Sequence, residues 1–252
     1  MTLRATHLVV LVLVQASGGC GRVRADAAPA ALRPAGAAEV SVTMASRLDG
    51  TIGSAAPDLW LGLSDRLTLG ITTSDRSRDG FGASRGLCVA GCLPADDLFR
   101  GLDVAARFPL VYGARRVTGE VATDIATWSP ARAAVRVAAI AERDGARFYA
   151  RARSELAIGL LGRADGNSDR LAARFTVGAQ GSGPLALEVT VGAAGPATDG
   201  FFADLAAPAG LWLALRPGGR WSAAAGLGTD DLLGGRARQG FAALSVEVRV
   251  AS

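Results

Sequence analysis

The stretch Leu59–Ile71, which reads LWLGLSDRLTLGI, decides the fold. On each side of its polar centre, Ser64–Arg66, leucine or isoleucine occupies every second position. Successive side chains of a strand point to opposite faces, so this period of two places the apolar residues of each run on one face. A short polar break between two such runs predicts a β-hairpin with a tight turn.

The same alternation recurs from residue 38 to the C-terminus. Twelve segments show it, and we interpret each as a strand: residues 40–48, 59–63, 67–71, 102–108, 117–125, 135–139, 148–160, 171–177, 185–191, 211–215, 221–227 and 244–250. The connections between them alternate, in the main, between short turns and longer loops. An even strand count with this alternation is the pattern of a transmembrane β-barrel whose short turns face the periplasm. Both termini then lie on the periplasmic side.

One segment also fits a helix. Ser129-Pro130 has the form of a helix start, and Asp144-Gly145 that of a helix end. At helical spacing, however, Val135 and Val137 fall on opposite sides and no apolar stripe forms. The period of two matches better, so a strand is the preferred interpretation.

Two segments carry a resemblance to a known family. They are the hairpin at residues 59–71 and Arg220–Asp230, which reads RWSAAAGLGTD and looks like a late strand entering an outer loop. Over residues 38–252 the chain resembles bacterial outer-membrane β-barrel proteins of the small-porin or channel kind. The resemblance implies an all-β fold: a single antiparallel up-and-down transmembrane β-barrel of about 12 strands, with short periplasmic turns and longer extracellular loops.

The resemblance also implies a location and partners. The location is the outer membrane of a Gram-negative cell. The implied partners are outer-membrane lipid and lipopolysaccharide, the barrel-assembly machinery and small solutes, and we expect no cofactor.

A barrel that spans lipid turns its apolar face outward, because hydrocarbon cannot solvate polar groups. The strand directions then place Phe108, Phe148 and Trp221 on the outside at the periplasmic boundary, as a girdle of interfacial aromatics. The alternative is a soluble sandwich with the same apolar face packed inward as a core. The many long, regular strands favour the membrane barrel over the sandwich.

The opposite face would line the lumen, where arginines and acids are nearly balanced. The residues that we single out as lumen-lining and as candidates for selectivity are Arg107, Arg136, Arg147, Arg151, Arg153, Arg174, Glu120, Asp124, Glu155 and Glu188. They have two interpretations. Either they form salt bridges that close a narrow barrel, or they form a charged constriction that sorts solutes by sign, as arginine rings do in anion pores.

The N-terminus has the layout of a secretory signal peptide over residues 1–27. An apolar run, Leu8–Val14, follows a basic start, and the Ala25–Ala27 triplet is of the A-x-A type. The run is too short for a membrane-spanning helix, which needs about 20 residues. Cleavage after Ala27 would leave a short periplasmic leader at residues 28–37. Lipid attachment at Cys20 is the alternative.

Cleavage also decides what chemistry is available. It leaves Cys88 and Cys92 as an even pair in an oxidising compartment, which predicts a disulfide. His7 is the only histidine and would be removed, and the chain has no lysine. Ser84 lies in a G-x-S-x-G pattern but would have no base to activate it, so we interpret it as a loop residue. We expect no metal site and no enzymatic activity.

Two loops carry weaker signals. The segment Asp165–Asp169 begins like a calcium loop but lacks the required Gly and Glu further on, so we interpret it as a polar outer turn. Phe201 and Phe202 are candidate contacts for lipopolysaccharide, or anchors of their loop against the barrel rim.

Net charge gives little indication of a partner. All 27 basic residues are arginine, against 23 acids, and removal of residues 1–27 leaves 24 against 22. This small excess does not predict nucleic-acid binding. The leading hypothesis is a passive channel for small polar or anionic solutes. The second is a non-conducting structural or adhesion barrel that acts through its long loops, above all residues 74–100, and the third is a soluble periplasmic β-protein.

Overall fold

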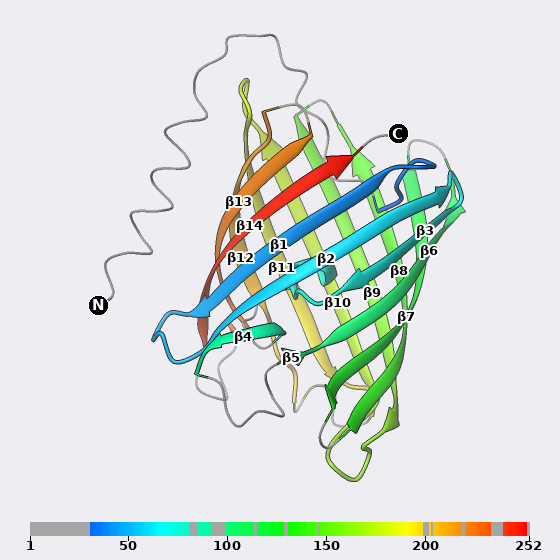
Figure 1. Ribbon diagram of the computed structural model, residues 1–252, viewed down its shortest axis with the longest axis vertical. Coiled ribbons are helices and arrows are strands. Elements are labelled where there is room, and N and C mark those ends of the chain that lie inside the picture. The colour runs from blue at the N-terminus through cyan, green and yellow to red at the C-terminus, as the bar shows by residue number, and fades with distance from the viewer. Residues whose placement is uncertain are drawn as a thin grey trace.

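The computed structural model describes residues 31–80, 85–91, 99–112, 115–128, 131–145, 147–198, 202, 204–217, 220–232 and 239–250. These residues form one antiparallel sheet that closes into a barrel (Figure 1). The strands of the closed wall are β1 (Ala38–Arg47), β2 (Gly53–Ser64), β3 (Leu67–Thr72), β6 (Leu102–Val111), β7 (Arg115–Trp128), β8 (Ala131–Asp144), β9 (Phe148–Leu161), β10 (Arg170–Gln180), β11 (Leu185–Pro196), β12 (Ala209–Leu215), β13 (Trp221–Thr229) and β14 (Gly240–Val250).

Closure comes from β1, which pairs with β2 on one side and with β14 on the other. Every wall strand therefore has two hydrogen-bonded neighbours, and the barrel has no free edge. The prediction of twelve antiparallel strands is confirmed. The sandwich interpretation is wrong, because one closed sheet, rather than two packed layers, accounts for all of these strands.

The segment from Ser74 to Arg100 differs from the predicted single outer loop. The chain leaves the wall after the short strand β3, runs inside the barrel, and returns as β4 (Gly86–Ala90) and β5 (Phe99–Arg100). Strand β4 pairs with the first residues of β2, beyond the end of β3, and β5 pairs with β4. The physical reason is the polar sequence after Thr72, whose side chains and amides find partners within the lumen.

Residues 131–144 form strand β8, so the helix alternative for this segment is wrong. Its buried residues alternate strictly from Ala134 to Glu142, as a period of two requires. Pro109, which follows the predicted strand 102–108, belongs to β6, and the strand continues past it through a bulge between Pro109 and Val111, where the ladder does not need the amide donor that proline lacks.

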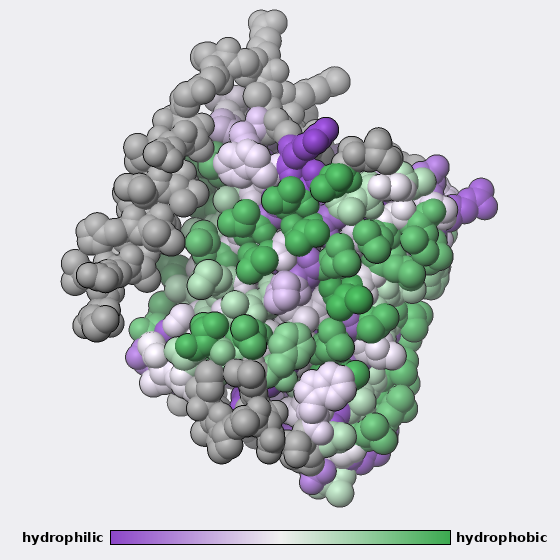
Figure 2. Space-filling model, in the orientation of Figure 1, coloured by the Kyte–Doolittle hydropathy of each residue, from purple (hydrophilic) through white to green (hydrophobic). Residues whose placement is uncertain are grey.

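The outer face of the wall is apolar on all sides. Large apolar side chains are exposed at alternate positions of the strands. Examples are Val40, Val42 and Met44 on β1, and Leu185, Leu187, Val189 and Val191 on β11. Figure 2 shows the visible wall largely green, with purple mainly near its two ends. A continuous apolar belt of this extent is the surface that a barrel presents to hydrocarbon. Among the described residues, no helix is long and apolar enough to cross a membrane.

Candidate functional site

The inner face of β6 to β9 carries a ladder of ion pairs, which we call the wall ladder: Asp103, Arg107, Glu120, Arg136, Glu142, Arg151, Arg153 and Glu155. Glu120 is its centre. The Glu120 carboxylate accepts hydrogen bonds from Arg107 Nε at 2.7 Å, Arg153 Nη2 at 2.5 Å and Arg136 Nη2 at 3.2 Å. Arg136 Nη2 also donates to Asp103 Oδ2 at 3.0 Å.

The wall ladder is buried from solvent. Relative exposure is 0% for Asp103, 1% for Glu120 and 2% for Arg136 and Arg153. Burying such charges is tolerated because each has several opposite partners. These contacts connect strands that are adjacent in the wall or separated by a single strand. The ladder therefore covers one side of the lumen and does not by itself cross it.

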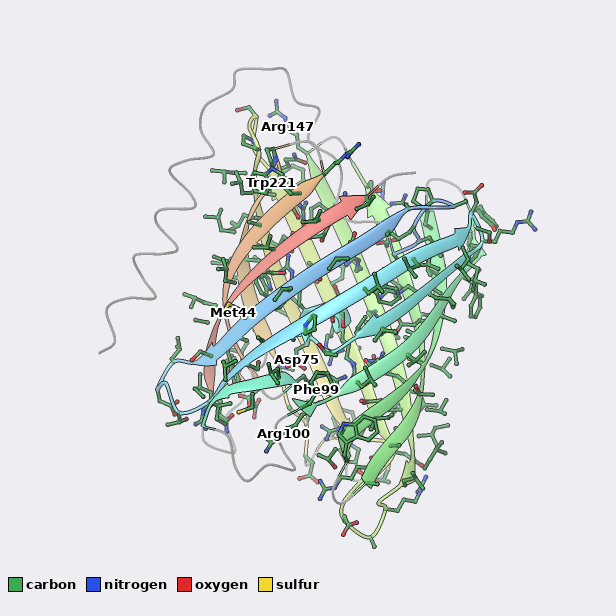
Figure 3. The ribbon with its side chains drawn as sticks, in the orientation of Figure 1. Met44, Asp75, Phe99, Arg100, Arg147 and Trp221 are labelled. Atoms are coloured by element: carbon green, nitrogen blue, oxygen red, sulfur yellow. The ribbon has the colours of Figure 1, made fainter. Side chains whose placement is uncertain are left out.

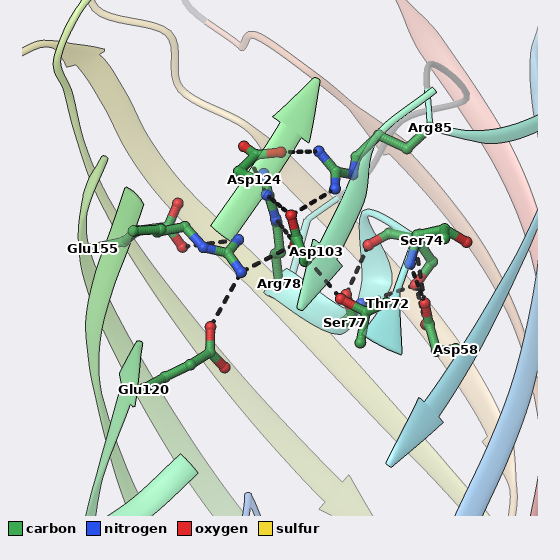
Figure 4. Close-up of polar contacts among 12 residues, drawn as sticks. Asp58, Thr72, Ser74, Ser77, Arg78, Arg85, Asp103, Glu120, Asp124 and Glu155 are labelled. Atoms are coloured by element: carbon green, nitrogen blue, oxygen red, sulfur yellow. Dashed lines mark hydrogen bonds and ion pairs between the residues drawn. The ribbon is translucent and has the colours of Figure 1, made fainter. Parts of the chain in front are cut away.

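A second group of contacts does cross the lumen, through the segment Thr73–Gly80, which we call the inward segment. It contains the short 3-10 helix η1 (Arg76–Arg78). Asp58 of β2 holds its start: the carboxylate accepts hydrogen bonds from the amides of Thr73 at 2.7 Å and Ser74 at 3.0 Å, and from the Ser74 hydroxyl (Figure 4). Figure 3 shows Asp75 of this segment within the barrel outline.

Arginines connect the inward segment to the wall ladder. Arg78 donates to Asp103 through Nη2 at 2.6 Å and Nε at 2.8 Å, and its Nη2 lies 2.8 Å from Asp124 Oδ2. Arg85, which precedes β4, bridges the same two acids at 3.0 and 3.1 Å (Figure 4). Two arginines and two aspartates thus form a compact cluster where the inward segment meets β6 and β7.

Further contacts reach the other walls. The Arg76 guanidinium lies 3.9 Å from the centre of the Trp212 ring and 3.9 Å from Glu188 Oε2. Asp79 accepts a hydrogen bond from Arg151 Nη1 at 3.0 Å. Burial opposes the ionisation of Asp79, which belongs to no strand, but the neighbouring Arg151 and Arg153 outweigh it and keep the pKa of that carboxyl below its ordinary value. The inward segment is therefore held from β2, from β6, β7 and β9, and from β11 and β12.

The residues before β1 narrow the lumen at the end of the short turns. We call residues 31–37 the leader. The Ala31 amide donates to Glu142 Oε2 at 3.1 Å, and Arg107 Nη1 donates to the Ala31 carbonyl at 3.3 Å. Nearer β1, Arg33 pairs with Glu39 at 2.5 Å, and its amide donates to Thr68 Oγ1 at 2.9 Å. Residues 31–33 of the leader therefore lie inside the barrel, against β1, β3, β6 and β8, whereas residues 34–36 are exposed beside the end of β2.

Between the leader and the inward segment a cavity of about 100 Å³ remains. Its lining includes Trp60, Trp212, Tyr149, Arg107, Asp79 and Glu188. This space holds a few water molecules and no larger solute. The described lumen is therefore narrowed from two sides by segments that do not belong to the wall.

Three of the lining aromatics share one arrangement. Trp60, Tyr149 and Trp212 lie opposite Gly70, Gly178 and Gly226 in the strand ladder. A Cβ at Gly70 would lie 2.3 Å from the Trp60 ring, so the glycine is what lets the ring lie flat on the next strand. Each ring has an arginine over it: Arg107 over Trp60 at 3.6 Å, Arg216 over Tyr149 at 5.4 Å and Arg76 over Trp212 at 3.9 Å.

Most of the predicted lumen residues lie where parity placed them. Six of them belong to the wall ladder: Arg107, Arg136, Arg151, Arg153, Glu120 and Glu155. Asp124 pairs with Arg78 and Arg85, and Glu188 pairs with Arg216. Arg174 also faces inward and donates to the Arg78 carbonyl at 3.0 Å. Arg147 does not line the lumen. It is exposed in the turn before β9, because strand parity no longer directs a side chain there (Figure 3).

The predicted girdle residues lie on the outer face. Phe108, Phe148 and Trp221 are exposed there, and each is close to a short turn. Cys88 lies in β4, whereas Cys92 lies outside the described residues, as do Ser84, Phe201 and residues 1–30. The disulfide, the signal peptide and its cleavage therefore stay predictions. Phe202 is exposed.

The polar interpretation of Asp165–Asp169 agrees with the contacts of Asp169. Its Oδ1 accepts hydrogen bonds from the Gly159 amide at 3.0 Å and from Arg163 Nη2 at 2.6 Å. Within the described ranges, no three potential metal-ligating side chains come together.

Sequence reasoning missed the residues that cross the lumen. Arg76, Arg78, Asp79 and Arg85 lie in what was predicted to be an outer loop, and Asp58 was not assigned a role. A signal was present in the alternation itself. Trp60 and Trp212 occupy inward positions of otherwise apolar-out strands, which indicates that something inside the barrel covers them.

Comparison with known proteins follows from this geometry. No protein-family model matches the chain, and no curated protein matches it. Solved structures do: the NanC porin (TM-score 0.58, 8% identity, 84% of this chain and 100% of that one) and the KdgM porin (0.53, 6%, 83% and 98%). A third is an outer membrane channel from Pseudomonas putida F1 (0.53, 13%, 89% and 100%).

The chain has the fold of outer-membrane porins. At these identities the likeness concerns the fold alone. It extends over nearly the whole length of each of the three proteins.

Proposed function

We propose that this protein is a porin-like channel of the outer membrane for small polar or anionic solutes, seen with its lumen closed. The outward apolar belt and the fold of the wall support the membrane location. Transport by a pore needs no catalytic group, and the sequence after residue 27 contains neither histidine nor lysine.

One observation carries the proposal: the obstruction is separable from the wall. The wall ladder runs along β6 to β9, whereas the contacts that cross the lumen belong to the inward segment and the leader. Both segments are held by hydrogen bonds, ion pairs and cation–π contacts, which water and ions can replace. An apolar plug would instead lose the hydrophobic contribution of its buried surface when it moved.

The buried guanidinium donors support the proposal that the solute is anionic. Buried guanidinium nitrogens of Arg85, Arg136, Arg174 and Arg216 make no hydrogen bond to the described residues, whereas no carboxylate oxygen is left in that state there. Guanidinium groups bind carboxylate and phosphate oxygens with matched geometry. An excess of such donors in a narrow lumen favours anions.

The test is conductance across a planar bilayer. Replacement of Arg76, Arg78 and Asp79 by serine removes the ion pairs and the cation–π contact that tie the inward segment to β6, β7, β9, β11 and β12, and it leaves every wall residue in place. We expect the wild type to show small or rare openings, and the triple variant to show a conductance several times larger that favours anions. The matched control replaces Asp49 and Asp230 by serine, in loops outside the lumen. If both proteins fold and neither conducts, the channel proposal is wrong.

The second candidate is a non-conducting barrel that acts through its loops. The near-complete burial of Arg136, Arg153, Glu120 and Asp103 favours it. Replacement of Arg151 and Arg153 by alanine separates the two candidates. A channel changes its ion selectivity, whereas a filled barrel loses thermal stability in the heat-modifiable gel shift and remains electrically silent.

A further inference from the structure

The outer wall is hollowed on the face of β6 to β11. An open groove of about 630 Å³ lies there, which is within the range of ligand sites. Phe108 and Leu110 form one wall of the groove, and Val137, Leu156 and Leu171 form another. Its floor is recessed below these side chains because the residues that pair across these strands are small: Gly119, Ala139, Ser154, Ala173 and Ala193.

The groove leads toward a charged rim. Ala139, Ala141 and Arg143 follow one another on the outer face of β8, and Arg143 is exposed where that strand nears its short turn. Four residues of strand span about 13 Å. With strands inclined by about 40°, Arg143 lies about 10 Å closer to the membrane surface than Ala139. One leaflet contributes about 15 Å of the hydrocarbon core, so groove and arginine fit within a single leaflet.

The rim around Arg143 is basic. Arg66, Arg147 and Arg220 are also exposed at the short-turn end. The exposed acids that the structure describes at this end are Asp65, in the turn with Arg66, and Asp144, which pairs with Arg116; Glu142, Glu39 and Glu247 face inward and pair with arginines. Phe148, an exposed aromatic, lies two residues along β9 from Ala150, the ladder partner of Arg143. An arginine beside interfacial aromatics at this depth is placed to meet lipid phosphates.

We infer that this groove and Arg143 form a binding site for a phospholipid with an anionic headgroup. One acyl chain lies in the groove between Phe108 and Leu171, and the headgroup accepts hydrogen bonds from Arg143. The inference rests on the membrane location in the proposed function and not on conduction.

A second copy of the chain is a poorer occupant. Copies inserted in one membrane have the same orientation, so their basic rims would meet at the same depth and repel each other. An anionic lipid instead supplies the opposite charge and a flexible chain that can follow the groove.

The test is retention of added lipid, read by native mass spectrometry of the folded full-length protein in detergent with equal phosphatidylglycerol and phosphatidylcholine. The wild type should retain one phosphatidylglycerol in preference. Arg143→Gln should reduce that preference about fivefold, the usual effect of one arginine near a membrane surface. Ala139→Phe fills the groove and should remove retention of both lipids at this site.

Matched controls keep the result specific. Arg66→Gln changes the same rim on the β2–β3 turn, and Ala225→Phe adds a ring to the outer face of β13, on other strands than the groove. Both should retain lipid like the wild type. If Arg66→Gln equals Arg143→Gln, or if Arg143→Gln and Ala139→Phe change nothing, the site does not exist. A dimer that Ala139→Phe disrupts would make the face a protein interface and overturn the inference. If the wild type shows no heat-modifiable gel shift, this result contradicts the membrane barrel of the proposed function rather than the lipid site.

Discussion

Glu120 pairs with three arginines of the lumen. Arg107, Arg136 and Arg153 all reach its carboxylate, and it is almost completely buried. Glu120→Gln keeps the volume and removes the charge, which leaves three guanidinium groups with reduced compensation. We expect a loss of about 3–5 kcal/mol in the free energy of unfolding, as for a broken buried ion pair.

Urea titration of folding into detergent micelles measures that loss. Asp144→Asn is the matched control, because it breaks the Arg116 pair at the partly exposed rim. Such pairs contribute about 1 kcal/mol or less. Equal effects of the two substitutions would mean that the wall ladder is solvated and contributes little.

Gly70 has no side chain, and this leaves room for the ring of Trp60. The Trp60 ring lies where a Cβ of Gly70 would be, and Arg107 stacks on the other side of that ring. Gly70→Ala should displace Trp60 and cost about 1–3 kcal/mol, the usual effect of overpacking. Gly183→Ala adds the same methyl group in open space and serves as the control. The urea midpoint shows the cost, and an unchanged midpoint for Gly70→Ala would contradict the flat stacking.

At the scale of elements, the position of the leader depends on its close approach to the backbone of β2. A Cβ at Gly62 would lie 1.9 Å from the Pro34 carbonyl oxygen, and the Gly62 amide donates to the Ala37 carbonyl at 2.8 Å. Gly62→Val should therefore displace the leader from β2 while the outer face is unchanged. The result should be an open lumen at the short-turn end.

Cysteine labelling reports that opening. Ala31→Cys, in a chain whose other cysteines are serine, places a thiol at a buried leader position. Maleimide should modify it slowly in the wild-type background and at least tenfold faster with Gly62→Val. Gly183→Val, in an open turn, should leave the rate slow. Fast labelling in every background would show that the leader does not occupy the lumen in solution.

The elements also show how far the sequence predicts this molecule. The alternation between apolar and polar residues predicts the wall because lipid and lumen impose opposite demands on successive side chains. It placed Arg136, Arg153 and Glu120 inside correctly. The inward segment was not predictable in this way, because its position depends on partners distant in sequence, such as Asp58 and Asp103, and a short polar stretch after β3 equally fits an outer loop. Arg147 was misplaced for a related reason, since parity ends where the strand ends.

At the scale of the whole molecule, the wall and the segments that fill its lumen are separate parts of the chain. The wall provides the outward belt and its own ion-paired ladder, and closes through β1 and β14 without the inward segment. The leader and the inward segment occupy the remaining lumen through polar contacts. A barrel built in this way can keep its fold while its interior rearranges, which is what a gated pore requires.

Closure of the barrel depends on the register between its first and last strands. Thr43 lies opposite Ser245, and their hydroxyl oxygens are 3.1 Å apart on the inner face. Thr43→Cys with Ser245→Cys should form a disulfide, since opposed residues of paired strands have the Cα separation that such a bond needs. The bond would close a loop of most of the chain and stabilise the fold by about 5 kcal/mol in the chain-entropy account. After boiling without reductant, the cross-linked chain should migrate faster than the linear one.

Thr43→Cys with Glu247→Cys is displaced by two residues, about 7 Å, and should remain linear. Cross-linking of the displaced pair alone would mean that the two strands close in another register, which would shift Glu39, Glu247 and Arg249 away from their present ion pairs.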